Sequence, residues 1–170
     1  MDMFLYHAIL PEDHDYYVSI EEIMSRGINY LTQSNNWYGN GGEIKSQITD
    51  MFKPLNAPIW VNFKTAIGVN LEPHKPKSFY FPIFTDKILV FDGDITMNIY
   101  DQSFYEENKF TFEEALDFDT GESIEHWIKL YWNSMMTLQE YLLKRPYSKP
   151  EVLVFEPIPK EIIRVCEEKS

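Results

Sequence analysis

The sequence predicts one α+β domain over residues 1–170, with a mostly antiparallel sheet and flanking helices. Two patterns predict this class. Short apolar runs typical of strands occur near both ends and in the middle of the chain, and other segments space their apolar residues as helices do. Hydrophobic residues make up 44% and aromatic residues 16% of the chain, so a buried core is expected rather than disorder.

The N-terminal elements are a strand and a helix. The strand is predicted over residues 4–9, and Pro11 closes it. A helix is predicted from Ser19 to Arg26, because the letters SIEE that open it form a capping box. We expect Gly27 to end or kink this helix.

The remaining predicted elements are a loop, three helices and four strands. Residues 34–42 are predicted to be a loop, and residues 43–52 a helix that ends before Pro54. A capping box at residues 111–114 opens a short helix, and the longest helix is predicted over residues 123–144. Predicted strands cover residues 59–63, 78–83, 87–91 and 151–155.

The stretch DGDIT at residues 92–96 has two interpretations. It has the D-x-D-x-T form of haloacid dehalogenase-type phosphotransferases, but Asp-Gly between apolar runs is also a strong signal for a hairpin turn. Such enzymes begin with the nucleophile strand and continue with alternating strands and helices, which this chain does not do. We therefore predict a hairpin at Asp92 and Gly93, with a returning strand along Ile95, Met97 and Ile99.

Composition excludes several classes of function. A net charge of −12 argues against broad, non-specific binding to nucleic acid, which depends on Lys and Arg. The single cysteine, Cys166, excludes an internal disulfide, and the four histidines are too scattered to predict a metal site. The first residues lack the features of a secretory signal, and no apolar run is long enough to span a bilayer. We expect a cytoplasmic protein without metal and without membrane association.

The two ends of the chain together resemble the ADP-ribosyltransferase superfamily. Near the start, Leu5-Tyr6-His7 precedes the helix that ends in Gly27-Ile28. Near the end, Glu151-Val152-Leu153-Val154 precedes Ile158-Pro159 and a further apolar pair. DNA-modifying toxins of the DarT type look most similar, since their chains end in a similar pattern of glutamate, apolar strand and Ile-Pro.

This resemblance implies a substrate and roles for individual residues. NAD would be the substrate, Glu151 would be the catalytic carboxylate, and His7 would contact the adenosine-side ribose. Tyr6 would belong to the same dinucleotide-binding group, and Tyr80 would pack on the nicotinamide ring. Each residue also has a structural interpretation, in which Glu151 faces solvent at a strand start, His7 lies at the edge of the core and Tyr80 lies within it.

Two hypotheses for function follow. The first is a cytoplasmic, NAD-dependent ADP-ribosyltransferase-like enzyme that modifies a macromolecular acceptor, either protein or nucleic acid. Trp37 and Tyr38, aromatic residues in the predicted loop, would then recognise the acceptor or partner. The second is a non-catalytic acidic protein that binds a basic partner protein and inhibits or modulates it, as immunity and anti-defence proteins do.

Overall fold

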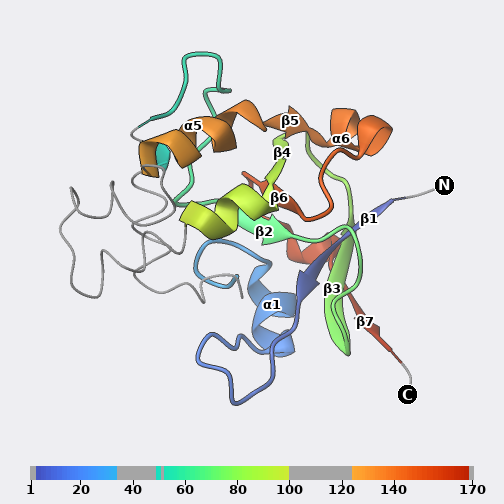
Figure 1. Ribbon diagram of the computed structural model, residues 1–170. Coiled ribbons are helices and arrows are strands. Elements are labelled where there is room, and N and C mark those ends of the chain that lie inside the picture. Colours follow the sequence, from blue (N-terminus) through green and yellow to red (C-terminus); the bar gives the residue numbers. More distant parts are fainter. Residues whose placement is uncertain (1–2, 34–48, 51, 100–123, 169–170) are drawn as a thin grey trace. The chain divides into compact units, whose positions relative to one another are not determined.

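The computed structural model describes residues 3–33, 49–50, 52–99 and 124–168, and it has an α+β fold (Figure 1). The strands are β1 (Phe4–Ala8), β2 (Ile67–Val69), β3 (Lys77–Pro82), β4 (Ile88–Asp92), β5 (Met136–Thr137), β6 (Pro150–Val154) and β7 (Arg164–Glu167). The helices are α1 (Ile20–Arg26), α5 (Ile124–Asn133), α6 (Leu138–Lys144) and the 3-10 turn η2 (Lys160–Ile162), and residues 93–99 are also helical.

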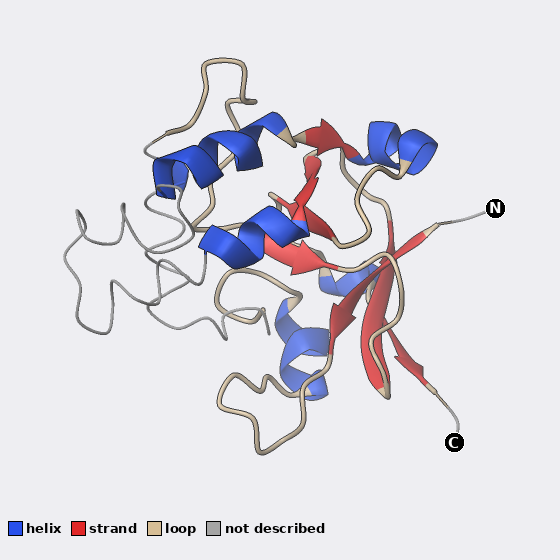
Figure 2. Ribbon diagram, in the orientation of Figure 1, coloured by secondary structure: helices blue, strands red, loops and turns tan. Residues whose placement is uncertain are grey.

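The strands form two sheets, which Figure 2 shows in red. One has the order β1-β3-β7 and the other the order β2-β6-β4-β5. The neighbouring strands β1 and β3, β3 and β7, β2 and β6, and β4 and β5 all pair antiparallel. The predicted α+β class with an antiparallel sheet is therefore confirmed. In the part of the chain that the structure describes, no helix is both long and apolar enough to cross a lipid bilayer.

The described residues group into two compact units. The first contains residues 3–33, 65–88 and 152–168, and the second contains residues 49–50, 52–64, 89–99 and 124–151. The single domain expected from the sequence therefore stays a prediction.

In the first unit, strand alternation separates a core face from an outer face. Leu5 and His7 of β1 and Phe79 and Phe81 of β3 point into the core and are buried. The predicted helix is confirmed as α1, and its N-cap Ser19 accepts a hydrogen bond from the Glu22 amide at 3.0 Å. It ends at Gly27 as expected.

Gly27 is required there for two reasons. Its φ angle is +77°, which side chains rarely adopt, and a Cβ atom would overlap the carbonyl oxygen of Ile158. Ile28 pairs with Ile158 in an isolated β-bridge, so the chain leaving α1 contacts the segment that follows β6.

The second unit is built around an aromatic core. Phe91 of β4 stacks on Tyr131 of α5 with ring centroids 4.2 Å apart and planes within 3° of parallel. Phe63 and Trp132 complete the group, and their rings meet edge to face at 5.5 Å. The Trp132 indole N–H donates to the carbonyl oxygen of Thr49 at 3.1 Å. All four rings are buried, so this core positions both α5 and β4.

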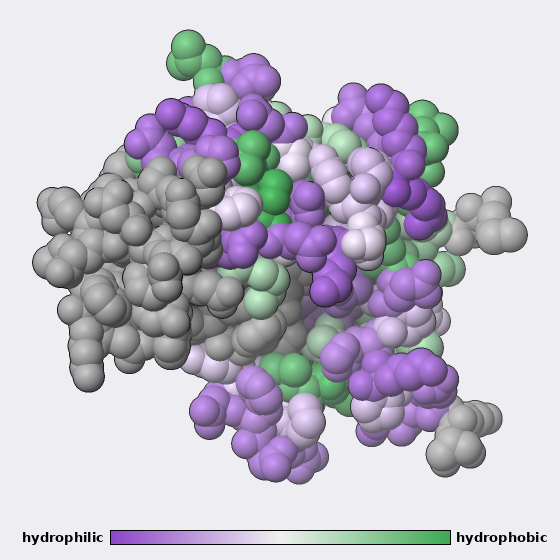
Figure 3. All heavy atoms as spheres, in the orientation of Figure 1, coloured by the Kyte–Doolittle hydropathy of each residue, from purple (hydrophilic) through white to green (hydrophobic). Residues whose placement is uncertain are grey.

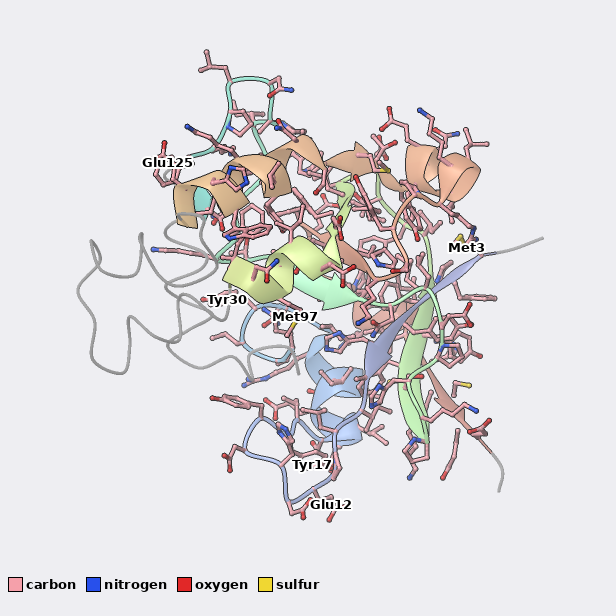
Figure 4. All side chains as sticks on the ribbon, in the orientation of Figure 1. Met3, Glu12, Tyr17, Tyr30, Met97 and Glu125 are labelled. Atoms are coloured by element: carbon pink, nitrogen blue, oxygen red, sulfur yellow. The ribbon has the colours of Figure 1, made fainter. Side chains whose placement is uncertain are left out.

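The hairpin predicted at Asp92 and Gly93 is wrong. Strand β4 ends at Asp92, and residues 93–99 form a helix instead of a returning strand. The Asp92 carboxylate accepts a hydrogen bond from the Asp94 amide at 3.0 Å. This hydrogen bond caps the start of the helix, so the chain enters a helix and not a hairpin turn. Met97, labelled in Figure 4, is 54% exposed, as a residue on the outer side of a helix can be.

The single long helix predicted over residues 123–144 is also wrong. It is divided into α5 and α6 by the short strand β5, which pairs with β4. The Ser134 hydroxyl donates to the Tyr131 carbonyl oxygen at 2.6 Å and helps to end α5. Thr137 and Glu140 then form a capping box that starts α6. The helical spacing of apolar residues continues through these caps, so the sequence pattern did not indicate the break between α5 and α6.

The other predicted elements have mixed outcomes. The strands predicted over residues 4–9, 78–83, 87–91 and 151–155 are confirmed as β1, β3, β4 and β6. The strand predicted over residues 59–63 is wrong, because this segment forms turns, and β2 and β7 were not predicted. The helix over residues 43–52 is described only in part, with residues 49–50 helical, and the helix opening at residue 111 lies outside the described residues.

Candidate functional site

His7 is a buried residue of the first unit. It is 1% exposed, and its Nδ1 lies 2.8 Å from the carbonyl oxygen of Gly68. Because a carbonyl can only accept, Nδ1 carries the proton of this hydrogen bond. Burial lowers the pKa of His7 to about 4, against the weaker opposing effect of the Gly68 hydrogen bond. His7 is therefore a neutral imidazole near neutral pH, and it ties β1 to β2.

Tyr6 and Tyr80 lie together on the outer face of the same sheet. They are direct partners in the β1–β3 register, with ring centroids 6.4 Å apart. Phe4 meets the Tyr80 ring edge to face at 5.3 Å, and all three side chains are partly exposed. The structure thus brings the two predicted tyrosines together but points His7 to the opposite face of β1. Tyr80 is not the core residue of the structural interpretation.

Glu151 lies in the second unit, near the start of β6, and is partly exposed. The hydroxyl of Tyr131 donates a hydrogen bond to its carboxylate. Tyr131 is fully buried, and its ring is fixed by stacking on Phe91. A rigid helix residue therefore orients the carboxylate that the sequence singled out.

A second hydrogen-bonded group joins β4 to the end of α5. The Asp92 amide donates to the Ser134 hydroxyl at 3.0 Å, and the Tyr147 hydroxyl donates to the Ser134 carbonyl oxygen at 2.7 Å. Burial raises the pKa of Tyr147, and the negative charge of Asp92 raises it further. Tyr147 therefore stays protonated and acts as a donor.

Sequence reasoning missed the two tyrosines that contact these polar groups. Tyr131 occupies an apolar position of the predicted long helix, where a tyrosine is expected to be a core residue. Tyr147 lies between two prolines, in a segment for which no element was predicted. The signal available was that a buried tyrosine hydroxyl needs a hydrogen-bond partner. Trp37 and Tyr38, the predicted recognition residues, lie outside the described residues.

The described residues contain little that would hold an ion. Within residues 3–33, 49–50, 52–99 and 124–168, no cluster of three or more His, Cys, Asp or Glu side chains could bind a metal. A hollow in the first unit is lined by Pro73, His74, Lys75, Pro76, Cys166 and Glu168. Lys75 and Glu168 form an ion pair at 2.9 Å within it, so their charges neutralise each other.

Comparison with family models, with curated proteins and with solved structures gives no match to this chain. A function therefore has to rest on the chemistry of its own residues, among which Glu151 with Tyr131 is the most specific arrangement.

Proposed function

We propose that this protein is an NAD-dependent ADP-ribosyltransferase-like enzyme that modifies a macromolecule, with Glu151 as its catalytic carboxylate. The observation that supports this role is the hydrogen bond from the buried Tyr131 hydroxyl to the Glu151 carboxylate. Tyr131 is fully buried and its ring stacks on Phe91, so this hydrogen bond fixes the direction of the carboxylate. Partial exposure leaves this carboxylate accessible to a substrate.

The chemistry of the transfer requires such a group. The bond between C1′ of the ribose and the nicotinamide nitrogen breaks, and nicotinamide leaves with the bonding electron pair. An oxygen or nitrogen of the acceptor forms the new bond to C1′, and its proton passes to a base. Positive charge develops on the ribose as the bond breaks, so a preorganised carboxylate stabilises the transition state more than the ground state. The same carboxylate can receive the acceptor proton.

The residues of the first unit have separate proposed roles. Tyr6 and Tyr80 present neighbouring, partly exposed rings, and their contact with the dinucleotide stays a prediction. The Nδ1–H group of His7 donates to the Gly68 carbonyl oxygen, and the side chain is buried. The ribose role of His7 stays a prediction.

Glu151→Gln tests the proposal directly. We expect release of nicotinamide from NAD to fall at least ~100-fold in this variant, while circular dichroism shows an unchanged fold. Tyr131→Phe keeps the stacked ring and removes the hydroxyl, so a loss of about 10- to 100-fold is expected for one hydrogen bond to a charged group. Glu161→Gln, an exposed glutamate outside this group, is the matched control and should keep full activity. Equal NAD turnover in the wild type and Glu151→Gln would refute the assignment.

A second candidate function is a non-catalytic acidic protein that binds a basic partner. The net charge of −12 favours it, together with two aliphatic side chains, Leu55 and Ile59, that are almost completely exposed. Complex formation that weakens with salt and does not depend on NAD would support this function. A calorimetric titration with NAD that shows no heat would favour the acidic binding protein over the enzyme.

A further inference from the structure

The chain passes from α6 to β6 through a basic segment, residues 143–149, with the sequence LKRPYSK. The side chains of Lys144, Arg145 and Lys149 are exposed, and Leu143 beside them is 83% exposed. Figure 3 shows hydrophilic and hydrophobic side chains next to one another over α6. Among the described residues, none of the three cationic side chains forms an ion pair with a carboxylate. The basic segment is therefore a cationic patch on a chain of net charge −12.

Hydrogen bonds hold the basic segment against its own unit. The Tyr141 hydroxyl donates to the Tyr147 carbonyl oxygen, and the Tyr147 hydroxyl donates to the Ser134 carbonyl oxygen, both at 2.7 Å. The Lys149 carbonyl oxygen accepts from the Gly93 amide at 2.8 Å. The rings of Tyr141 and Tyr147 also stack, with their centroids 6.1 Å apart. Because these contacts fix the backbone, binding through the segment costs little conformational entropy.

Arg145 adopts a backbone conformation that residues with a side chain disfavour. Its φ angle is +42° and its ψ angle is +54°, which is the left-handed conformation, directly after α6. Glycine is the usual residue at such a helix end, because a Cβ atom is strained there. Among the described residues, Arg145 is the only one other than glycine with a positive φ angle. Strained residues of this kind cluster at functional positions, which points to a role for the arginine side chain.

The carboxylates around the basic segment have other hydrogen-bond partners. Glu140 accepts from the Thr137 amide at 2.9 Å in the capping box of α6, and Glu151 accepts from the Tyr131 hydroxyl. Asp92 accepts from an amide of the helix that follows it. The basic segment itself contains no Asp or Glu. Its positive charge is therefore not paired locally, and the close spacing of the cations favours an anionic partner.

The surroundings of the cations decide which kind of anion fits. Nucleic acid is held by phosphate contacts along a longer cationic track or by exposed aromatic rings. Here Tyr141 is buried, and the ring of Tyr147 stacks on it. Segments that recognise anionic lipid contain about four to eight Lys or Arg residues, more than this one has. Leu143 adds an exposed aliphatic contact, so the combination fits a protein surface on which carboxylates surround an apolar side chain.

We propose that the basic segment is a docking site for a partner protein with an acidic surface. Carboxylates of the partner bind Lys144, Arg145 and Lys149, and an apolar side chain of the partner packs on Leu143. Docking at this site requires neither NAD nor catalysis by Glu151.

A photoreactive amino acid at position 143 of the full chain identifies the partner. After crosslinking in an extract of the source cells, mass spectrometry locates the attached peptide, which we expect to be rich in Asp and Glu. The partner is then purified, and its Kd is measured for the wild type and each variant. The absence of a crosslinked protein, or attachment to a peptide without acidic residues, would overturn the docking site.

The variant Arg145→Gly separates binding from folding. Glycine adopts a φ angle of +42° without strain, so the Tm of this variant should equal or exceed that of the wild type. The same change removes one cation from the segment, and we expect the Kd for the partner to rise at least ~10-fold. An unchanged Kd would contradict the role of the arginine side chain and with it the docking site.

Two double variants separate the charge of the segment from the charge of the whole chain. Lys144→Gln with Lys149→Gln removes two positive charges from the segment, and Lys64→Gln with Lys160→Gln removes two from exposed positions outside it. We expect the Kd to rise at least ~10-fold in the first variant and to change less than about twofold in the second. Equal Kd values in the two variants would overturn the docking site. So would a labelled single-stranded oligonucleotide, or phosphatidylserine-containing vesicles, whose binding only the first variant abolishes, because the segment would then recognise nucleic acid or a membrane.

Discussion

Acidification should destabilise the protein through one buried side chain, His7. In the folded protein its pKa is lowered to about 4 by burial, while an unfolded chain has the ordinary value of 6.5. Between these two values the unfolded chain binds a proton that the folded protein does not bind. The free energy of unfolding therefore includes a contribution from neutral His7 that is complete above pH 6.5 and is lost as the pH falls towards about 4.

The size of this contribution follows from the two pKa values. Their difference corresponds to about 3 kcal/mol, at about 1.4 kcal/mol for each pH unit. From about pH 7.5 to about pH 4.5, the loss from His7 alone is ~2.5 kcal/mol. Because a domain is stable by only about 5–15 kcal/mol, this is a large part of the total.

A matched variant separates His7 from the carboxylates that also titrate in acid. In His7→Asn, the side-chain amide can still donate to Gly68 from nearly the position of Nδ1, but it binds no proton. The smaller side chain should cost about 1–2 kcal/mol at every pH. In urea unfolding over a pH series, the wild type should lose ~2.5 kcal/mol relative to the variant by about pH 4.5, so that the variant becomes the more stable of the two. Parallel curves, or an NMR titration of the His7 ring with a midpoint near 6.5, would refute the assignment.

Two further predictions concern the corrected elements. Gly93→Ala should destabilise the protein by about 2 kcal/mol in urea unfolding, because its Cβ would overlap the Lys149 carbonyl oxygen. This cost exceeds the ~1 kcal/mol that alanine gains over glycine in helix propensity. Unchanged or higher stability would show that the backbone at Lys149 moves away from position 93 at little cost. Thr137→Ala should cost about 1 kcal/mol by removing the N-cap of α6, whereas Thr137→Ser should cost almost nothing, and equal losses in both variants would exclude capping as the cause.

Local signals were sufficient where the structure depends on local contacts. The N-cap Ser19 and Gly27 mark the two ends of α1 as predicted, and alternation placed Leu5 and His7 of β1 on one face. The same kind of signal failed at Asp92, because an Asp-Gly pair suits a hairpin and an aspartate suits an N-cap. The choice between them depends on the residue before β6, since the Gly93 amide donates to the Lys149 carbonyl oxygen at 2.8 Å. That contact spans a long stretch of sequence, so no local pattern contains it.

The candidate site shows the same difference between local signals, which the sequence contains, and long-range contacts, which it does not. The position of Glu151 at a strand start was predictable, but its contact with Tyr131 was not, because the two residues belong to separate elements. Likewise, the hydrogen bond of His7 depends on Gly68 of β2, a strand of only three residues with a central glycine, which is too short to be predicted.

Strand alternation also limits how the predicted dinucleotide group can act. Tyr6 and His7 are neighbours in β1, so their side chains lie on opposite faces of one sheet. A ligand that stacks on Tyr6 and Tyr80 approaches the outer face, where the His7 ring is not accessible. The predicted ribose contact of His7 therefore does not fit a ligand on that face, and His7 would influence such a ligand only through the hydrogen bond that joins β1 to Gly68. Loss of NAD binding in a His7 variant would thus indicate that β1 has moved. Loss of NAD binding in a Tyr6 variant would indicate direct contact between the ligand and the Tyr6 ring.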